Sequence, residues 1–102
     1  MSTAVWVWLD LEMTGLDVNL DQILEVSCIL TTPSLREFTT QHYSEVVHYD
    51  DSVLDNMSEW CIEHHGNSCL TEACRQSKKP LSEIETQLIS YIQEHTLPTD
   101  ML

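Results

Sequence analysis

The sequence has 102 residues, which is enough for one domain and too few for two. Four lysine and arginine residues stand against 17 aspartate and glutamate residues, so the formal net charge is −13. This charge argues against long duplex nucleic acid as a partner, because Lys and Arg contacts to phosphate dominate that affinity. A ligand with one or two phosphates remains open if metal ions supply the positive charge.

Three strands are predicted in the first half of the chain. Residues 5–11 are apolar and rich in Val and Trp, which suits a strand buried on both faces. Residues 23–31 form the second strand, with one face entirely apolar, and residues 32–34 fit a turn. Residues 36–49 are β-prone but alternate poorly, which favours a third strand at the edge of a sheet.

From about Asp51 the spacing of apolar residues changes to three and four, which predicts helices. Ser58 is expected to cap a separate helix that ends near Gly66. Ser68 is expected to begin another short helix that runs through Cys74.

The last helix is predicted to start at Pro80, and Ser82 and Glu85 have the spacing of a capping box. Its apolar stripe consists of Leu81, Ile84, Leu88, Ile89 and Ile92. Strands followed by helices indicate an α+β fold. If the strands pair in sequence, they make a small three-stranded antiparallel sheet with an open edge.

Two carboxylates, Asp10 and Glu12, lie inside an apolar run. They are two residues apart on a predicted strand, so their side chains leave the same face with Cα atoms roughly 6.5 Å apart. Such a pair needs either a raised pKa on one member or a divalent cation between them. The D-x-E pattern alone is a weak signal. In the alternative interpretation Asp10 faces solvent at the end of the strand and Glu12 belongs to the loop.

The acid pair belongs to the stretch WLDLEMTGLD, which is followed by DQILEVSCIL and, further on, MSEWCIEHHGNSCLT. Together these stretches resemble oligoribonuclease, the small-RNA branch of the DEDD (DnaQ-like) 3′-to-5′ exonucleases, whose fold is of the α/β ribonuclease H-like type. The resemblance covers nearly the whole chain. It implies that residues 1–102 are about the first half of a family domain and lack the later motifs, which carry two further acids and a histidine.

By this resemblance, Asp10 and Glu12 are catalytic residues that bind a pair of Mg²⁺ or Mn²⁺ ions. The implied activity is 3′-to-5′ hydrolysis of short single-stranded RNA oligonucleotides, down to dinucleotides, to nucleoside 5′-monophosphates. The isolated 102-residue chain is expected to be inactive, and the full-length family member to be a homodimer. The alternatives are a non-catalytic nucleotide-binding or dimer-poisoning fragment, and an acidic protein-interaction domain.

The resemblance also implies a set of substrate contacts. Leu16 matches an apolar wedge that lies against the bases of a bound dinucleotide, and Met13 and Thr14 line the same pocket. Trp60 matches an aromatic residue that packs on the 3′ base. His65 matches a polar contact at the sugar–phosphate end of the substrate.

Each of these residues has a plainer interpretation. On pattern alone, Trp60 on an apolar helical face is a core residue and Leu16 is an ordinary apolar residue beside a turn. His64 and His65 fit a solvated helix end, where a positive charge is favourable. Glu25 interrupts an apolar strand and is expected to face solvent rather than the active-site side.

A rival metal site would use Cys61, His65, Cys69 and Cys74, because Cys and His four apart on a helix can share a zinc ion. The sequence contains no C-x-x-C pair, however, and its apolar surroundings favour packed helices. The carboxylate site is therefore the preferred hypothesis.

The four cysteines accompany no signal-peptide pattern, since MSTAVW lacks a basic start and a long apolar core. We therefore expect reduced thiols and an intracellular protein, in the cytoplasm or, with a leader, in the mitochondrion. No apolar run is long enough to span a bilayer, so no membrane partner is expected.

Overall fold

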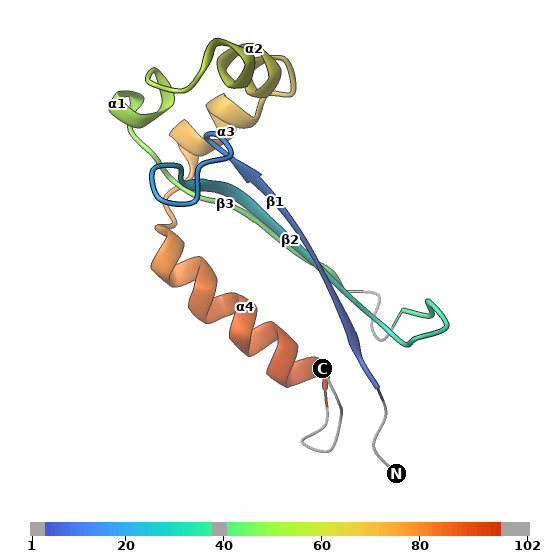
Figure 1. The fold of residues 1–102 in the computed structure, drawn as a ribbon. Coiled ribbons are helices and arrows are strands. Elements are labelled where there is room, and N and C mark those ends of the chain that lie inside the picture. Colours follow the sequence, from blue (N-terminus) through green and yellow to red (C-terminus); the bar gives the residue numbers. More distant parts are fainter. Residues whose placement is uncertain (1–3, 38–40, 97–102) are drawn as a thin grey trace.

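The computed structural model describes residues 4–37 and 41–96. In this part of the chain three antiparallel strands come first and four helices follow. The molecule is elongated, with extents of 50 × 26 × 24 Å. Three short helices gather at one end of the sheet, and the fourth runs along the sheet on one side (Figure 1). The predicted α+β arrangement is confirmed.

The sheet has the order β1-β2-β3, formed by β1 (Trp6–Met13), β2 (Ile23–Thr31) and β3 (Tyr43–Val46). The bounds of β2 are those predicted, whereas β3 is much shorter than the predicted 36–49. The side chains on one face of β2 form the centre of the core. They are Leu24, Val26, Cys28 and Leu30, none more than 4% exposed.

The prediction that the first strand is buried on both faces is wrong. Trp6, Trp8 and Leu9 are 45%, 47% and 53% exposed. Their strand lies at an edge of the sheet, and helix contacts in the described residues fall mainly on β2 and β3. The strand also runs past Leu11 to Met13, so Glu12 belongs to the strand and not to the loop.

The helical end of the molecule consists of α1 (Asp51–Leu54), α2 (Glu59–Asn67) and α3 (Leu70–Gln76). The Ser58 hydroxyl accepts the Cys61 N–H at 3.2 Å, which confirms the predicted cap of α2. Helix α3 begins two residues later than expected. These helices close over Leu24 of β2 through Leu54, Met57, Cys61, Leu70 and Cys74.

The long helix α4 (Leu81–His95) packs on β2 and β3. The predicted capping box is wrong, because Pro80 is the N-cap residue and Ser82 already lies inside the helix. The predicted stripe is wrong at Ile89, which is 50% exposed. The other members of the predicted stripe, Leu81, Ile84, Leu88 and Ile92, pack into the core together with Tyr91.

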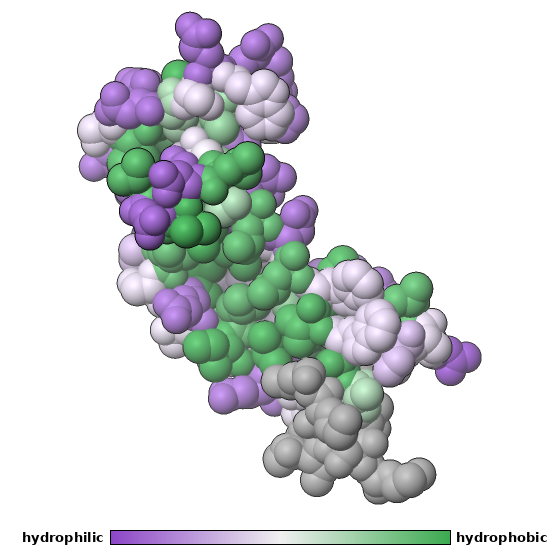
Figure 2. Space-filling view, viewed as in Figure 1, coloured by the Kyte–Doolittle hydropathy of each residue, from purple (hydrophilic) through white to green (hydrophobic). Residues whose placement is uncertain are grey.

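Hydrophobic side chains also gather on the outer surface of the molecule (Figure 2). In the described part of the chain, the most exposed large apolar side chains are Leu16, Val18 and Leu20, at 93%, 91% and 79%. All three belong to the loop between β1 and β2. Among the described residues, no helix is long and apolar enough to cross a membrane.

Candidate functional site

The two predicted acids lie on one face of β1, near its end. Asp10 stands opposite Ser27 of β2, and Glu12 stands opposite Glu25. The register shifts between Glu12 and Met13. Irregularities of this kind redirect the chain and are common beside active sites. The strand therefore presents both carboxylates on the same side just before the chain turns away.

This face of the sheet is strongly acidic. Burial raises the pKa of Glu25, and the carboxylates of Glu12 and Asp10 raise this pKa further, while His65 opposes them. Among the described residues, no Lys or Arg forms an ion pair with Asp10 or Glu12. The expectation that Glu25 faces solvent is wrong, because it is only partly exposed and shares a small cavity with Glu12.

The loop that follows β1 is closed by Thr14. The Thr14 N–H donates to the Gln22 carbonyl at 2.9 Å, and the Gln22 N–H donates to the Thr14 hydroxyl oxygen at 2.9 Å. The same hydroxyl donates to Oδ1 of Asp21 at 2.9 Å. Thr14 is buried and its side chain is committed to the loop, which projects the exposed Leu16.

Helix α2 carries the other predicted residues to the end of β1. His65 is 2% exposed, and its Nε2 donates to the Met13 carbonyl at 2.9 Å. Trp60 is 66% exposed, and its ring stacks on His64 at 4.6 Å with an interplanar angle of 12°. Trp60 is therefore not a core residue, and His65 is not part of a solvated helix end.

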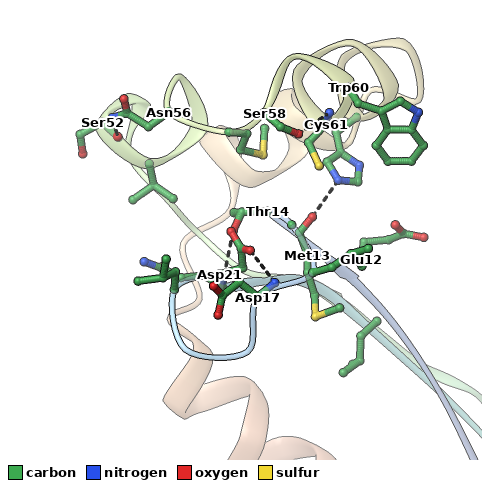
Figure 3. Close-up of a pocket in the computed structure, with 18 residues that line it drawn as sticks. Glu12, Met13, Thr14, Asp17, Asp21, Ser52, Asn56, Ser58, Trp60 and Cys61 are labelled. Atoms are coloured by element: carbon green, nitrogen blue, oxygen red, sulfur yellow. Dashed lines mark hydrogen bonds between the residues drawn. The ribbon is translucent and has the colours of Figure 1, made fainter.

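These elements enclose one cavity of about 880 Å³ (Figure 3). Six of the seven predicted site residues line it, namely Glu12, Met13, Thr14, Leu16, Trp60 and His65. Asp10 does not line the cavity, because it lies two residues before Glu12 on β1. No sequence pattern predicted that α1 and the residues after it would form another wall of the cavity, through Ser52, Val53, Asn56 and Met57.

A sequence model of the exonuclease (RNase_T) family matches residues 7–100. The chain belongs to this family. It is 45% identical over 95 residues to a Saccharomyces cerevisiae protein named "Oligoribonuclease, mitochondrial", a match that covers 87% of this chain and 35% of that relative. It is 47% identical over 90 residues to a "Probable oligoribonuclease" of Dictyostelium discoideum, covering 88% and 47%.

A bacterial relative, the "Oligoribonuclease" of Colwellia psychrerythraea, is 44% identical over 88 residues, covering 86% of this chain and 48% of the relative. The chain thus spans between about a third and a half of the length of these relatives. The resemblance to oligoribonuclease is confirmed over most of the sequence.

The donor set of this exonuclease-family chain fits a hard divalent cation. Mg²⁺ is commonly held by one or two carboxylates, with water and substrate phosphate as its other ligands. The side chains of Asp10 and Glu12 can supply such a pair. In the described part of the chain, no three Cys, His, Asp or Glu side chains come together as a complete metal site. The rival zinc site is therefore not formed.

Proposed function

We propose that this chain forms part of the active site of a 3′-to-5′ exoribonuclease of the oligoribonuclease type, which hydrolyses short RNA oligonucleotides to nucleoside 5′-monophosphates. The observation that carries the proposal is the cavity beside the paired carboxylates, which is lined by Leu16 from the loop after β1 and by Trp60 and His65 from α2. The names of the relatives support it. These names do not favour the alternative of a non-catalytic binding fragment.

In this proposal Asp10 and Glu12 hold Mg²⁺ or Mn²⁺, with two ions in the complete site. When bound, such ions activate a water molecule and stabilise the charge that develops on the phosphate oxygens. The role of the two carboxylates is to place the ions at the end of β1. The unrelieved negative charge on this face supports the proposal, because a cation would remove the repulsion among the carboxylates.

The proposed substrate contacts divide into apolar and polar ones. Leu16 and Trp60 offer exposed apolar surfaces to the bases, and stacking of this kind tolerates any base because every base has a π-face. Met13 and Thr14 would line the pocket beside the 3′ nucleotide. The Met13 carbonyl and the Thr14 hydroxyl and N–H are already hydrogen-bonded within the chain, so they are not the groups that would bind the substrate. A contact from His65 to the sugar–phosphate end would have to come from the ring edge opposite Nε2.

Two further aspects of the proposal rest on the family. We propose that the full-length protein is a homodimer that acts on single-stranded RNA oligomers of a few nucleotides. We also propose an intracellular location, in the cytoplasm or the mitochondrion, because the yeast relative is named as mitochondrial.

Binding is tested by calorimetric titration of the RNA dinucleotide pApA into the chain in Mg²⁺. Trp60→Ala should weaken binding by about 1–3 kcal/mol, the usual worth of one base stacked on an aromatic ring. The matched control is Trp6→Ala, which removes an exposed tryptophan outside the cavity. Equal losses in both variants, or no binding by the unchanged chain, would contradict the proposal.

Hydrolysis is tested in a chimera. The matched residues of this chain would replace the corresponding 90 residues of the Dictyostelium discoideum relative. We expect release of nucleoside monophosphates from short RNA, and loss of that release in Asp10→Ala. Residues 1–102 alone should bind without hydrolysis, because two carboxylates cannot by themselves fix the positions of two metal ions. An inactive chimera that is folded would count against the proposed reaction.

A further inference from the structure

We infer that Asp21 is a positioning residue for substrate binding: its carboxylate fixes the loop 14–22 so that Leu16 is held at the cavity before a nucleotide arrives. This inference rests on the proposed function, because the position of Leu16 matters only if the cavity accepts a base. It adds a residue that neither the acid pair nor the aromatic contacts include.

The two oxygens of the Asp21 carboxylate bind the two residues on either side of the exposed tip. Oδ1 accepts the Thr14 hydroxyl proton at 2.9 Å, and Oδ2 accepts the Asp17 N–H at 2.8 Å (Figure 3). Only Gly15 and Leu16 lie between these two anchoring points. One side chain therefore fixes both ends of the segment that carries Leu16.

Leu16 needs such support because its own side chain contributes little to holding it. It is 93% exposed, so its packing in the free chain is slight. If a loop becomes ordered only when the ligand binds, the affinity for the ligand falls by about tenfold for each backbone residue that becomes fixed. A loop already fixed by hydrogen bonds avoids this loss.

Gly15 gives a second observation on the same carboxylate. A Cβ atom at this position would lie 2.5 Å from Oδ2 of Asp21 and 2.7 Å from its Cγ. The φ angle of Gly15 is not positive, so its backbone conformation is open to other residues. A side chain at this position would therefore push the Asp21 carboxylate away from its two hydrogen bonds, whereas the turn itself places no demand for glycine.

The test measures pApA binding in Mg²⁺ by calorimetry, with the chain as it stands. We expect Asp21→Ala to weaken binding by about tenfold, and Asp21→Asn, which keeps one acceptor, to weaken it less. The matched control is Asp55→Ala, which removes the same charge from an exposed position outside the cavity. Its affinity should equal that of the unchanged chain.

The decisive readout is coupling to Leu16. In a Leu16→Ala background, Asp21→Ala should cause no further loss of affinity, although it should still lower the melting temperature. A loss of equal size in both backgrounds would mean a merely structural role and would overturn the inference.

A second double-mutant cycle combines Gly15→Ala with Asp21→Ala. It should lower the melting temperature of the unchanged chain, and it should have almost no effect on that of the Asp21→Ala chain. Equal costs in both would also overturn the inference. Binding that Asp21→Ala leaves unchanged refutes this inference alone, whereas absence of binding by the unchanged chain refutes the proposed function and the inference with it.

Discussion

The hydrogen bond between His65 and Met13 is expected to hold α2 against the end of β1, and its removal gives the sharpest prediction on stability. The imidazole is 2% exposed, and its Nε2 lies 2.9 Å from the Met13 carbonyl oxygen. Leaving a partly buried carbonyl without its donor costs about 1–3 kcal/mol. Truncation to alanine adds a cavity, so we expect His65→Ala to lower the free energy of unfolding by about 2–4 kcal/mol.

His65→Phe separates the two contributions, because it keeps a ring of similar size and removes the donor. We expect it to lose about 1–3 kcal/mol in urea unfolding followed by circular dichroism. Glu63→Ala, at an exposed position of the same helix, is the control and should stay within about 0.5 kcal/mol. If His65→Phe were as stable as the unchanged chain, the hydrogen bond would not be what secures α2.

Three further predictions concern ionisation and charge. Burial and the carboxylates of Glu12 and Asp10 raise the pKa of Glu25 from its usual 4.5, so the stability given by its protonated form is lost as pH rises through the folded pKa. Glu25→Gln in EDTA should therefore melt higher than the unchanged chain at neutral pH, with a gap that closes below pH 4.5; a constant gap would contradict this. Burial raises the pKa of Cys74 to about 11. Iodoacetamide should label the exposed Cys69 first and Cys74 only on unfolding, as mass spectrometry of peptides would show. Dinucleotide affinity should change less than about threefold between about 50 and 200 mM KCl, because no described Lys or Arg lines the cavity, whereas a steep fall would indicate phosphate contacts from Lys or Arg.

Local patterns predicted the elements that depend on local contacts. The bounds of β2 follow from alternation over nine residues, and the cap at Ser58 follows from a side chain three residues from its partner. Burial of β1 could not be predicted in this way. Its apolar residues are compatible with burial on both faces, but exposure depends on which other elements cover the strand.

The residues that sequence reasoning missed depend on register and loop closure. Alternation places Glu25 on one face of its own strand, but only the pairing of β1 with β2 puts it opposite Glu12. Aspartate is a common residue in turns, so nothing in the pattern singles out Asp21. Its role depends on its hydrogen bonds with Asp17 and Thr14, four and seven residues earlier in the chain. The nearest signal in the sequence is Gly15. Only the structure shows that its φ angle is not positive, so that the nearby carboxylate and not the turn accounts for a glycine here.

The charge of the chain explains why the acid pair would be central to binding a phosphate at all. Two of the four cationic side chains are already paired, Arg75 with Asp51 and Glu72, and Lys79 with Glu45. With a net charge of −13, a phosphate approaching this face meets repulsion unless divalent ions stand between it and the carboxylates. Metal and RNA would then each increase the affinity of the other by the same factor, because binding linkage is reciprocal. Under the proposed function, the carboxylates that repel the substrate in the absence of metal are the groups that bind it in its presence.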